Sequence, residues 1–427
     1  MLAAGTVVVL ALGLAGCSGE VGAVPSKLPA QHGGSLPAAV SEQLDAALAQ
    51  AMQWSAASGA VAGVWAPWAG EWTSAQGVTT ADGKVPVSTD MHFRSAASER
   101  PMACTVMLRL ADAGQLEVSD LVADLLPGLP GIDGITLGQL CQGTAGLADY
   151  RTQFGSIFVN NPKRNWSDME LVSAGLASTA TATAPGAIWQ DSATATALLG
   201  MALSAHTGTS WAELYQQNVF GPLGLAQTSL PDNGRLDIRA PSPHGYAAAV
   251  NPDGTRDCSV VLDETRLSPS QGGAAGGVVS NLEDLKTWSQ ALADGRLLSG
   301  RSTKAQLATI PLGGDAPSWQ GYGLGVQKIG PLFGQDGEVP GFLTAAYSDP
   351  STGLTVAVML NNSTAGKGFA QQLAMQLASI GSKAPAPGNA STPLIELPWS
   401  VEQTAAALQA GAVCQAPAEA PAEAPAE

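Results

Sequence analysis

Two serines, Ser95 and Ser98, stand at the start of a helical run in the stretch FRSAASERPM, residues 93–102. A serine hydroxyl becomes a nucleophile only when a nearby base takes its proton. Neither serine is followed by a lysine or histidine one helical turn later, and each could instead cap the following helix through its hydroxyl. A hydrolase that uses one of these two serines as its nucleophile is therefore only the second of two functional hypotheses. Ser98 is the better candidate of the two.

Cysteine and histidine spacing gives no metal-binding pattern. The chain has no Cys-x-x-Cys pair and no cluster of cysteine with histidine, the usual donors of a structural zinc site. We therefore expect no metal and no cofactor. The histidines are scattered along the chain, at His32, His92, His206 and His244.

The charge balance argues against nucleic acid as a partner. Nineteen Lys and Arg face 35 Asp and Glu, and the resulting net charge of −16 repels phosphate backbones and supplies no polybasic patch for anionic lipids. With 427 residues, 45% of them apolar and 13% charged, the chain can bury a large globular core.

The first sixteen residues are uncharged and apolar, too short for a membrane span, and end in the sequence Leu14-Ala15-Gly16 before Cys17. They resemble a bacterial lipoprotein signal. The resemblance implies that Cys17 is lipidated and anchors an exported protein on the outer face of the cytoplasmic membrane, in the cell envelope. An ordinary secretory signal, or a chance match, is the alternative. One feature of such signals is missing, since no Lys or Arg precedes the apolar run. Residues 17–37, rich in Gly, Pro and Ser, are predicted to form a flexible tether.

The spacing of apolar residues predicts where the folded domain begins. Val40, Leu44, Leu48 and Met52 share one face of a helix over 38–54, and two β-rich runs follow. Helical signals then dominate until strands return near the end of the chain. The β-rich runs are 59–68 and 70–78, the helices 102–113, 137–142, 168–177, 192–206 and 281–295, and the later strands 322–330, 341–349 and 353–362.

This order predicts an α/β (α+β) fold. One antiparallel sheet is built from both ends of the chain and flanked by helices, and an all-helical region is inserted between its two halves. The domain covers 38–382, with its sheet from 55–96 and 320–362 and its helical region over 97–265. Residues 383–427 are predicted to form a linker, a short helix within WSVEQTAAALQAGAV and a tail of Pro, Ala and Glu.

Long segments of the chain resemble the serine β-lactamases and D-Ala-D-Ala carboxypeptidases, the penicillin-recognising serine hydrolases. The likeness runs in order over residues 38–380, through FRSAASERPM, PGAIWQDSATA, AAGGVVSNLEDLKTWSQALADG and GQDGEVPGF. It implies the β-lactamase-like fold. The residues at the positions that carry the family's chemistry, however, are replaced.

The family's nucleophile and base are missing. In the family a serine opens a helix and a lysine follows three residues later, in Ser-x-x-Lys, so that both side chains share one face. On this pattern Ala97 takes the place of the serine and Arg100 that of the lysine. Alanine has no nucleophilic atom, and a guanidinium has no lone pair to act as a base. No lysine in the chain has a serine three residues before it.

Two further motifs and one single position depart from the family pattern. The family's Tyr-x-Asn, which serves proton transfer and substrate binding, matches Asp191-Ser192-Ala193. The motif that holds the substrate's carboxylate matches Gln335-Asp336-Gly337, in which only the glycine is kept and Asp336 would repel that carboxylate. The family's usual histidine within LCQGTAGL is Gly143.

The resemblance also implies a contact between two of these positions. In the family the residues at positions 100 and 191 point at each other across the pocket, so Arg100 and Asp191 are expected to form a buried ion pair. The alternative is that both side chains face solvent.

The cysteines after Cys17 suggest two disulfides in an oxidising compartment. Cys104 lies two helical turns after the vacant serine position, and Cys141 lies on a segment expected to pack nearby, so these two are expected to pair. Cys258 would then pair with Cys414. Two small core residues are the alternative for the first pair.

The sequence thus predicts a catalytically silent relative of these hydrolases, a pseudoenzyme held in the envelope by a lipid at Cys17. Its role would be to bind an envelope component or a protein partner. The resemblance alone suggests peptidoglycan peptides as the ligand, whereas the lost carboxylate-binding motif makes a protein partner an equal alternative. A structural envelope lipoprotein without a pocket function is a further alternative.

Overall fold

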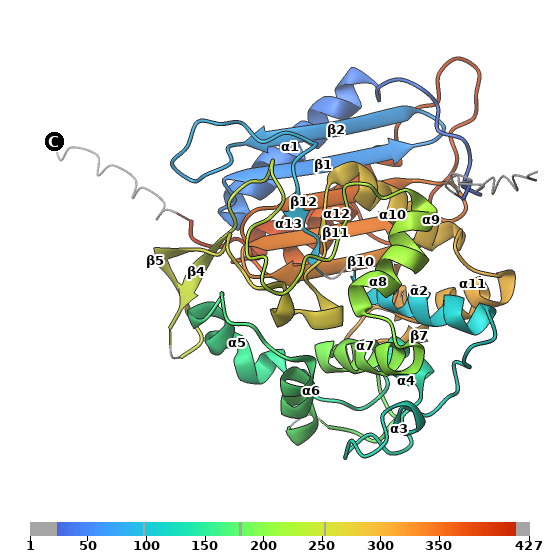
Figure 1. Ribbon diagram of the computed structural model, residues 1–427. Coiled ribbons are helices and arrows are strands. Elements are labelled where there is room, and N and C mark those ends of the chain that lie inside the picture. The colour runs from blue at the N-terminus through green and yellow to red at the C-terminus, as the bar shows by residue number, and fades with distance from the viewer. Residues whose placement is uncertain (1–23, 97–98, 179–181, 252, 416–427) are drawn as a thin grey trace, which may run out of the picture.

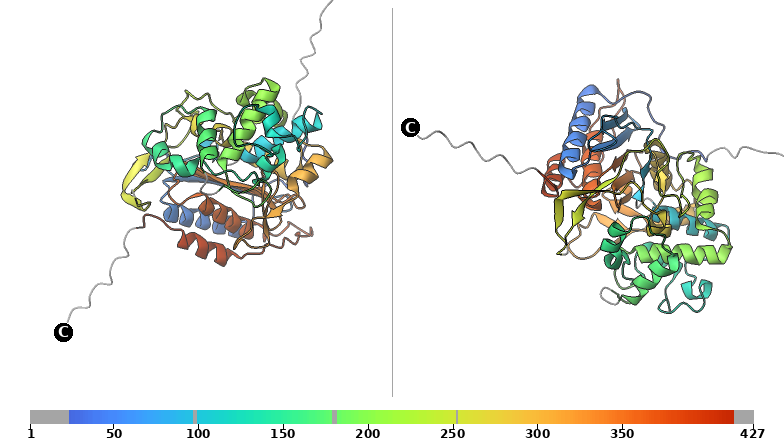
Figure 2. Two further views of the ribbon diagram at one scale, coloured as in Figure 1. Left: turned by 90° about the horizontal axis from the view of Figure 1, so that it is seen from below. Right: turned by 60° about the vertical axis from the view of Figure 1, so that its left-hand side comes forward.

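A computed structural model describes residues 24–96, 99–178, 182–251 and 253–415. One eight-stranded antiparallel sheet lies between two layers of helices, and the left view of Figure 2 shows the three layers edge-on. Its strand order is β2-β1-β12-β11-β10-β9-β8-β7. The strands are β1 (Gly59–Ala66), β2 (Gly70–Gly77), β7 (Ile310–Pro311), β8 (Gln320–Tyr322), β9 (Gln327–Ile329), β10 (Leu332–Val339), β11 (Phe342–Ser348) and β12 (Thr355–Leu360).

Both ends of the chain contribute to the sheet (Figure 1). Strand β1 pairs antiparallel with β12, so that Ala60 lies opposite Leu360 and Trp65 opposite Thr355. Every residue of β1 and β12 is buried, because helices cover both faces of these central strands. A sheet made from both halves of the chain, with its last strand in the interior, is what the sequence predicts.

Among the described residues, three helices cover one face of the sheet. They are α1 (Ala38–Ser55), α12 (Lys367–Gly381) and α13 (Val401–Ala410). Leu44 and Leu48 of α1 are fully buried in this layer, and Ser400 and Gln403 form a reciprocal capping box that starts α13. The predicted first and last helices are therefore present, whereas α12 was not predicted.

The helical region covers the opposite face and holds the larger core. Its amphipathic helix α10 (Leu282–Asp294) is capped by the side chain of Asn281 and buries Leu285 and Trp288 against the sheet. The other helices are α2 (Glu99–Asp112), α3 (Val122–Leu125), α4 (Leu137–Gln142), α5 (Arg151–Asn160), α6 (Asp168–Ala177), α7 (Ala193–Thr207), α8 (Trp211–Tyr215), the π-helical turn η2 (Gln216–Phe220), α9 (Gly221–Leu223), the 3-10 turns η3 (Pro269–Gln271) and η4 (Gly273–Ala275), and α11 (Gly300–Leu307).

Part of the predicted helical region is β structure. Strands β4 (Tyr246–Val250) and β5 (Arg256–Asp263) form a hairpin that projects from the body, at the left of Figure 1. The connecting sequence begins Asn-Pro-Asp-Gly, which is typical of a turn and could have revealed the hairpin. A second small ladder joins β3 (Phe93–Arg94) to β6 (Val279–Ser280).

The described part of the expected tether lies against the domain. The backbone N–H of His32 donates to the carbonyl of Pro67, and that of Leu36 donates to the carbonyl of Glu71. Leu36 is also buried. Backbone hydrogen bonds to the β1–β2 turn and to the start of β2 hold this segment, so it is ordered without apolar periodicity. Cys17 and the apolar run before it lie outside the described residues.

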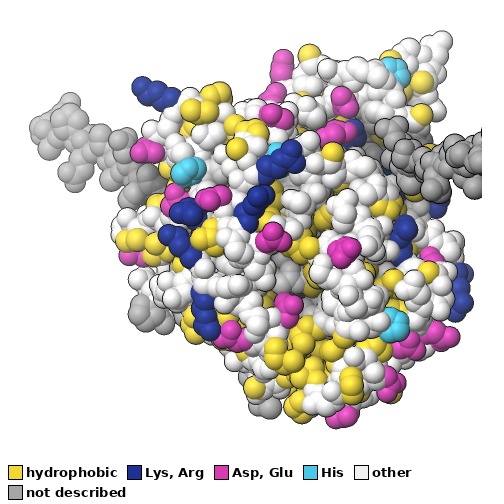
Figure 3. Space-filling view, in the orientation of Figure 1, with side chains coloured by type: hydrophobic (Ala, Val, Ile, Leu, Met, Phe, Trp, Pro, Cys, Tyr) yellow, Lys and Arg dark blue, Asp and Glu magenta, His cyan; other side chains and the backbone are white. Residues whose placement is uncertain are grey.

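Within the described ranges, no helix combines the length and apolarity of a membrane span. On the face shown in Figure 3, basic side chains lie singly or in small groups among acidic and uncharged ones. That face therefore presents no continuous basic surface.

Candidate functional site

A cluster of charged side chains joins the helical region to the sheet layer. The carboxylate of Asp191, in the loop before α7, contacts Nη1 of Arg100 through Oδ1 and Nζ of Lys367 through Oδ2. Nη2 of Arg151 lies 3.8 Å from Oδ2. Arg100 comes from the first turn of α2 and Lys367 is the first residue of α12. The expected pairing of Arg100 with Asp191 is present, and two cations that the sequence reasoning missed complete it.

Burial makes this cluster electrostatically strong. The side chains of Arg100 and Asp191 are 10% and 22% exposed, so water screens their attraction poorly. Burial acts to raise the pKa of Asp191, but Arg100, Arg151 and Lys367 outweigh it and hold that pKa far below its usual value. Burial acts to lower the pKa of Arg100, but Asp191 and other neighbours raise it above its usual value. Arg100 therefore stays charged and cannot accept a proton.

The space beside Arg100 is almost filled. The cavity there has a volume of about 10 Å³, close to what one water molecule needs. The rings of Trp189 and Tyr322 form part of its wall, with centroids 5.4 Å apart. Burial raises the pKa of Tyr322 to about 12, so its hydroxyl stays protonated and is a poor base. This cavity beside Arg100 therefore has room for no more than about one water molecule.

Gly143 ends α4 in the left-handed conformation, with φ of 72°. A Cβ there would lie 2.9 Å from Nε1 of Trp189 and 3.0 Å from the carbonyl oxygen of Gln190. The position at which the family has a histidine is therefore closed to side chains by the loop that carries Asp191.

Replacing Gly143 by alanine is expected to lower the free energy of unfolding by about 2–3 kcal/mol, because strain and crowding add. Gly114→Ala is the matched control: Gly114 has φ of 69°, but a Cβ at that position would meet no heavy atom within 4 Å among the described residues. That variant should lose only about 1 kcal/mol from the left-handed backbone. Urea denaturation of both variants measures the difference, and equal losses would show that the 189–190 loop does not press on Gly143.

The second replaced motif offers no free catalytic group. The hydroxyl of Ser192 is buried and donates to the carbonyl of Ala148 at 3.2 Å, while Ala193 is buried at the start of α7. Only Asp191 of this motif faces the charged cluster. The hydroxyl and amide that the family uses here have no counterpart in these three residues.

The third replaced motif lies on β10. Gln335 and Asp336 are both buried. Nε2 of Gln335 donates to the carbonyl of Asp336 at 3.3 Å, and its Oε1 has no hydrogen-bond partner among the described residues. Burial raises the pKa of Asp336, against the opposing effect of Lys367. Gly337 pairs with Thr344 of β11, so this strand has kept its place although its ligand-binding side chains have changed.

The relocated-nucleophile hypothesis loses one of its two serines. Ser95 is fully buried, and its hydroxyl donates to the carbonyl of Val278 at 3.3 Å. Ala96, the next residue, has φ of 48°, an uncommon conformation for a residue with a Cβ. Ala97 and Ser98 lie outside the described residues, so Ser98 is left as the one untested candidate of that pair.

An open groove of about 680 Å³ begins on the other side of Asp191. This volume lies within the range of ligand pockets. The groove runs between α5, the β4–β5 hairpin, the end of β10 and the start of α12. Its lining includes three cations and three acids, together with apolar side chains; the charged residues are Arg151, Arg256, Lys367, Asp149, Asp191 and Glu338.

Most of the charged side chains that line the groove already have an ion-pair or hydrogen-bond partner. Arg151 forms a close ion pair with Asp149, at 2.5 Å between Nη2 and Oδ2, and Lys367 is paired with Asp191. Glu338 accepts a hydrogen bond from the backbone N–H of Lys367. Burial raises the pKa of Glu338, although the nearby cation Arg256 opposes that rise. Sequence reasoning missed this groove because its walls come from five distant segments.

Two disulfides are present, and they join the pairs expected from the sequence. Cys104 and Cys141 are bonded in the core. Cys104 lies one helical turn after Arg100 on α2, and Cys141 lies on α4. Cys258 and Cys414 are bonded at the surface and join the β4–β5 hairpin to the segment after α13. Among residues 24–415 outside the gaps, no three His, Cys, Asp or Glu side chains are grouped as a metal site would require.

A family model described as Beta-lactamase matches residues 44–379, which include the whole sheet. The chain belongs to the beta-lactamase family. Penicillin-binding protein 4 of Amycolatopsis lactamdurans is 26% identical to it over 311 residues, 68% of this chain and 77% of that protein. Penicillin-binding protein 4* of Bacillus subtilis (strain 168) is 26% identical over 273 residues, 61% of this chain and 58% of that protein.

Solved structures show that the beta-lactamase family fold is shared. A D-stereospecific amidohydrolase from Streptomyces sp. superposes with a TM-score of 0.65 and 28% identity, covering 76% of this chain and 94% of that one. A D-amino acid amidase from Ochrobactrum anthropi SV3, complexed with L-phenylalanine amide, gives a TM-score of 0.64 at 22% identity, covering 76% and 90%. The fold expected from the sequence is thereby confirmed.

Proposed function

We propose that this protein is a catalytically silent member of the beta-lactamase family that binds a ligand in the groove beside Asp191. The network of Arg100, Asp191 and Lys367 carries the proposal, because it places mutually satisfied charges where the family has a proton-transfer pair. The cavity of about 10 Å³ beside Arg100 supports the loss of chemistry. The groove of about 680 Å³ supports retained binding.

The ligand would be an envelope component, such as a peptidoglycan peptide, or a protein partner. The apolar run before Cys17 supports an exported protein anchored by a lipid on the outer face of the cytoplasmic membrane. Mass spectrometry of the mature N-terminus distinguishes a lipidated Cys17 from the product of an ordinary secretory signal.

Covalent labelling tests the loss of catalysis. Residues 18–427 are treated with a fluorescent penicillin and a fluorophosphonate, beside a variant that carries Ala97→Ser, Arg100→Lys, Asp191→Tyr and Ala193→Asn. We expect the natural protein to stay unlabelled and the restored variant to become labelled, because only the variant has a nucleophile with a lysine one turn away. The matched control carries the last three substitutions and keeps Ala97, and it should not react.

The second candidate function is a serine hydrolase that uses Ser98. The names of the relatives, penicillin-binding proteins and a D-stereospecific amidohydrolase, favour it. In that case the natural protein itself becomes labelled, and peptide mapping places the adduct on Ser98. Such an adduct would overturn the silent-protein proposal.

A further inference from the structure

The β4–β5 hairpin is one wall of the groove beside Asp191. Ala249 and Val250 of β4 and Arg256 and Leu262 of β5 line the groove, opposite residues of α5 and α12. The width of the groove therefore depends on where this hairpin is held.

The two strands of the hairpin are held very differently. The inner strand β4 is bonded to the body: the N–H of Tyr246 donates to the carbonyl of Asn361, and the N–H of Ala248 donates to Oγ1 of Thr364. Among the described strands, the outer strand β5 pairs with β4 only, and the register shifts so that residues 258–260 have no partner on β4. In this unpaired bulge lies Cys258.

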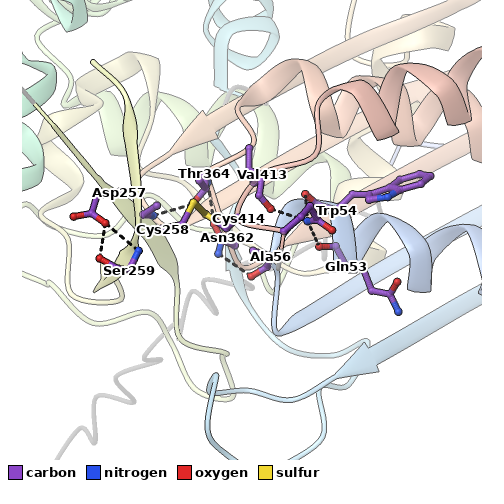
Figure 4. The surroundings of a disulfide bond; sticks show 12 residues. Gln53, Trp54, Ala56, Asp257, Cys258, Ser259, Asn362, Thr364, Val413 and Cys414 are labelled. Atoms are coloured by element: carbon purple, nitrogen blue, oxygen red, sulfur yellow. Dashed lines mark hydrogen bonds between the residues drawn. A yellow bond between two sulfur atoms is a disulfide. The ribbon is translucent and has the colours of Figure 1, made fainter. Parts of the chain in front are cut away.

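The disulfide from Cys258 crosses to a separate support. Cys414 follows Val413, whose N–H donates to the carbonyl of Trp54 at the end of α1. Nε2 of Gln415 donates to the carbonyl of Gln53. Figure 4 shows the disulfide bridging the hairpin and this C-terminal segment, which lies against the end of α1. The Cys258–Cys414 bond thus ties the bulge of the outer strand to the helical layer behind the sheet.

The two disulfides of the protein differ in access to solvent. Cys104 and Cys141 are each 3% exposed, within the core. Cys258 lies on an exposed part of β5 and Cys414 is partly exposed. A reductant must reach a sulfur atom to attack it, so the surface bond is the one that can be opened while the domain stays folded.

We propose that the Cys258–Cys414 disulfide is a removable brace that sets the position of the groove wall. A dithiol reductant breaks the S–S bond and becomes oxidised to its own disulfide. The two electrons and two protons that it gives up form the thiols of Cys258 and Cys414. The outer strand β5 is then no longer tied to the C-terminal segment beside α1, and only its pairing with β4 holds it. The hairpin moves outward, and the groove beside Asp191 widens. This control of ligand access rests on the proposed function of the groove, whereas the movement of the hairpin does not.

The experiment measures backbone hydrogen exchange together with thiol alkylation during a titration with dithiothreitol. We expect alkylation of Cys258 and Cys414 before Cys104 and Cys141, and exchange over residues 246–263 about tenfold faster once the surface bond opens. Exchange in β11 and β12 should not change. The variant Cys258→Ser with Cys414→Ser should match the reduced protein without reductant and respond no further.

Several results would overturn the brace. Unchanged exchange in the hairpin after reduction would show that β4 alone holds it. Faster exchange throughout the domain, or a double variant that fails to fold, would show that the bond stabilises the whole domain and not the hairpin in particular. Reduction of both disulfides at the same dithiothreitol concentration would show that the surface bond cannot be opened selectively. Labelling of the restored four-substitution variant reports separately on the proposed function, and on this proposal its acylation by penicillin should become faster after reduction.

Discussion

Replacing Asp191 by asparagine should destabilise the domain by about 3–5 kcal/mol, the cost of leaving a buried charge without its partner. Asparagine keeps the size of the side chain and removes the negative charge. Arg100 would then stay cationic in a site that is 10% exposed, next to a second cation, Lys367. The midpoint of urea denaturation at pH 7 measures the loss. Asp232→Asn, at an exposed aspartate, is the matched control and should change stability by less than about 0.5 kcal/mol.

Partner substitutions separate the contributions inside the cluster. Lys367 is 43% exposed, so Lys367→Met should cost no more than about 1 kcal/mol. Arg100→Met combined with Asp191→Asn removes both buried charges and should cost less than the sum of the two single substitutions. Additive losses for that pair would contradict a direct interaction, and a loss below about 1 kcal/mol for Asp191→Asn would contradict the burial.

The same ion pair gives an acid limit to stability. Because the folded-state pKa of Asp191 is held below its unfolded value, its stabilisation is complete above the unfolded pKa, about 3.9. This stabilisation is lost as the pH falls further, because Asp191 becomes protonated in the unfolded chain while it stays ionised in the folded protein. Asp191→Asn should therefore lose less stability than the natural protein between pH 4 and pH 2.

The helices and strands that could be predicted from the sequence are those whose buried positions require apolar residues. The helix over 282–294 follows from apolar periodicity, and the central strand over 355–360 follows from its largely apolar run. The resemblance then aligned positions 100 and 191, which allowed the ion pair to be predicted although 91 residues separate its members. Such a contact has no local signal, and only a template for the fold brings the two positions together.

The remaining parts of the site had no signal of that kind. Lys367 has no serine three residues before it, and nothing in its local sequence shows that α12 starts beside Asp191. The filling of the pocket depends on Trp189 and Tyr322, whose side chains meet across 133 positions of sequence. The hairpin was missed for a different reason: β5 is largely exposed, so it lacks the apolar alternation that marks a strand.

Glu99 gives the second large effect, and it acts in the opposite pH direction. It lies in the first turn of α2, is fully buried, and accepts a hydrogen bond at Oε1 from the N–H of Val278. The hydroxyl of Ser95 also interacts with this carboxyl group. Burial raises its pKa to about 8, against the opposing effects of hydrogen bonds and of Arg100. The folded protein therefore holds a neutral carboxylic acid at a pH where the unfolded chain holds a carboxylate.

A raised folded-state pKa means that the stabilisation is complete below the unfolded pKa, about 4.3, and is lost as the pH rises towards 8. Glu99→Gln keeps the neutral shape and removes the titration. We expect its stability to match that of the natural protein within about 1 kcal/mol at pH 5 and to exceed it by about 3 kcal/mol at pH 9. Denaturation midpoints across this range measure the difference, with Glu42→Gln on the exposed face of α1 as the control. Parallel pH profiles for Glu99→Gln and the natural protein would show that Glu99 is charged in the fold, and that its surroundings are more polar than its contacts indicate.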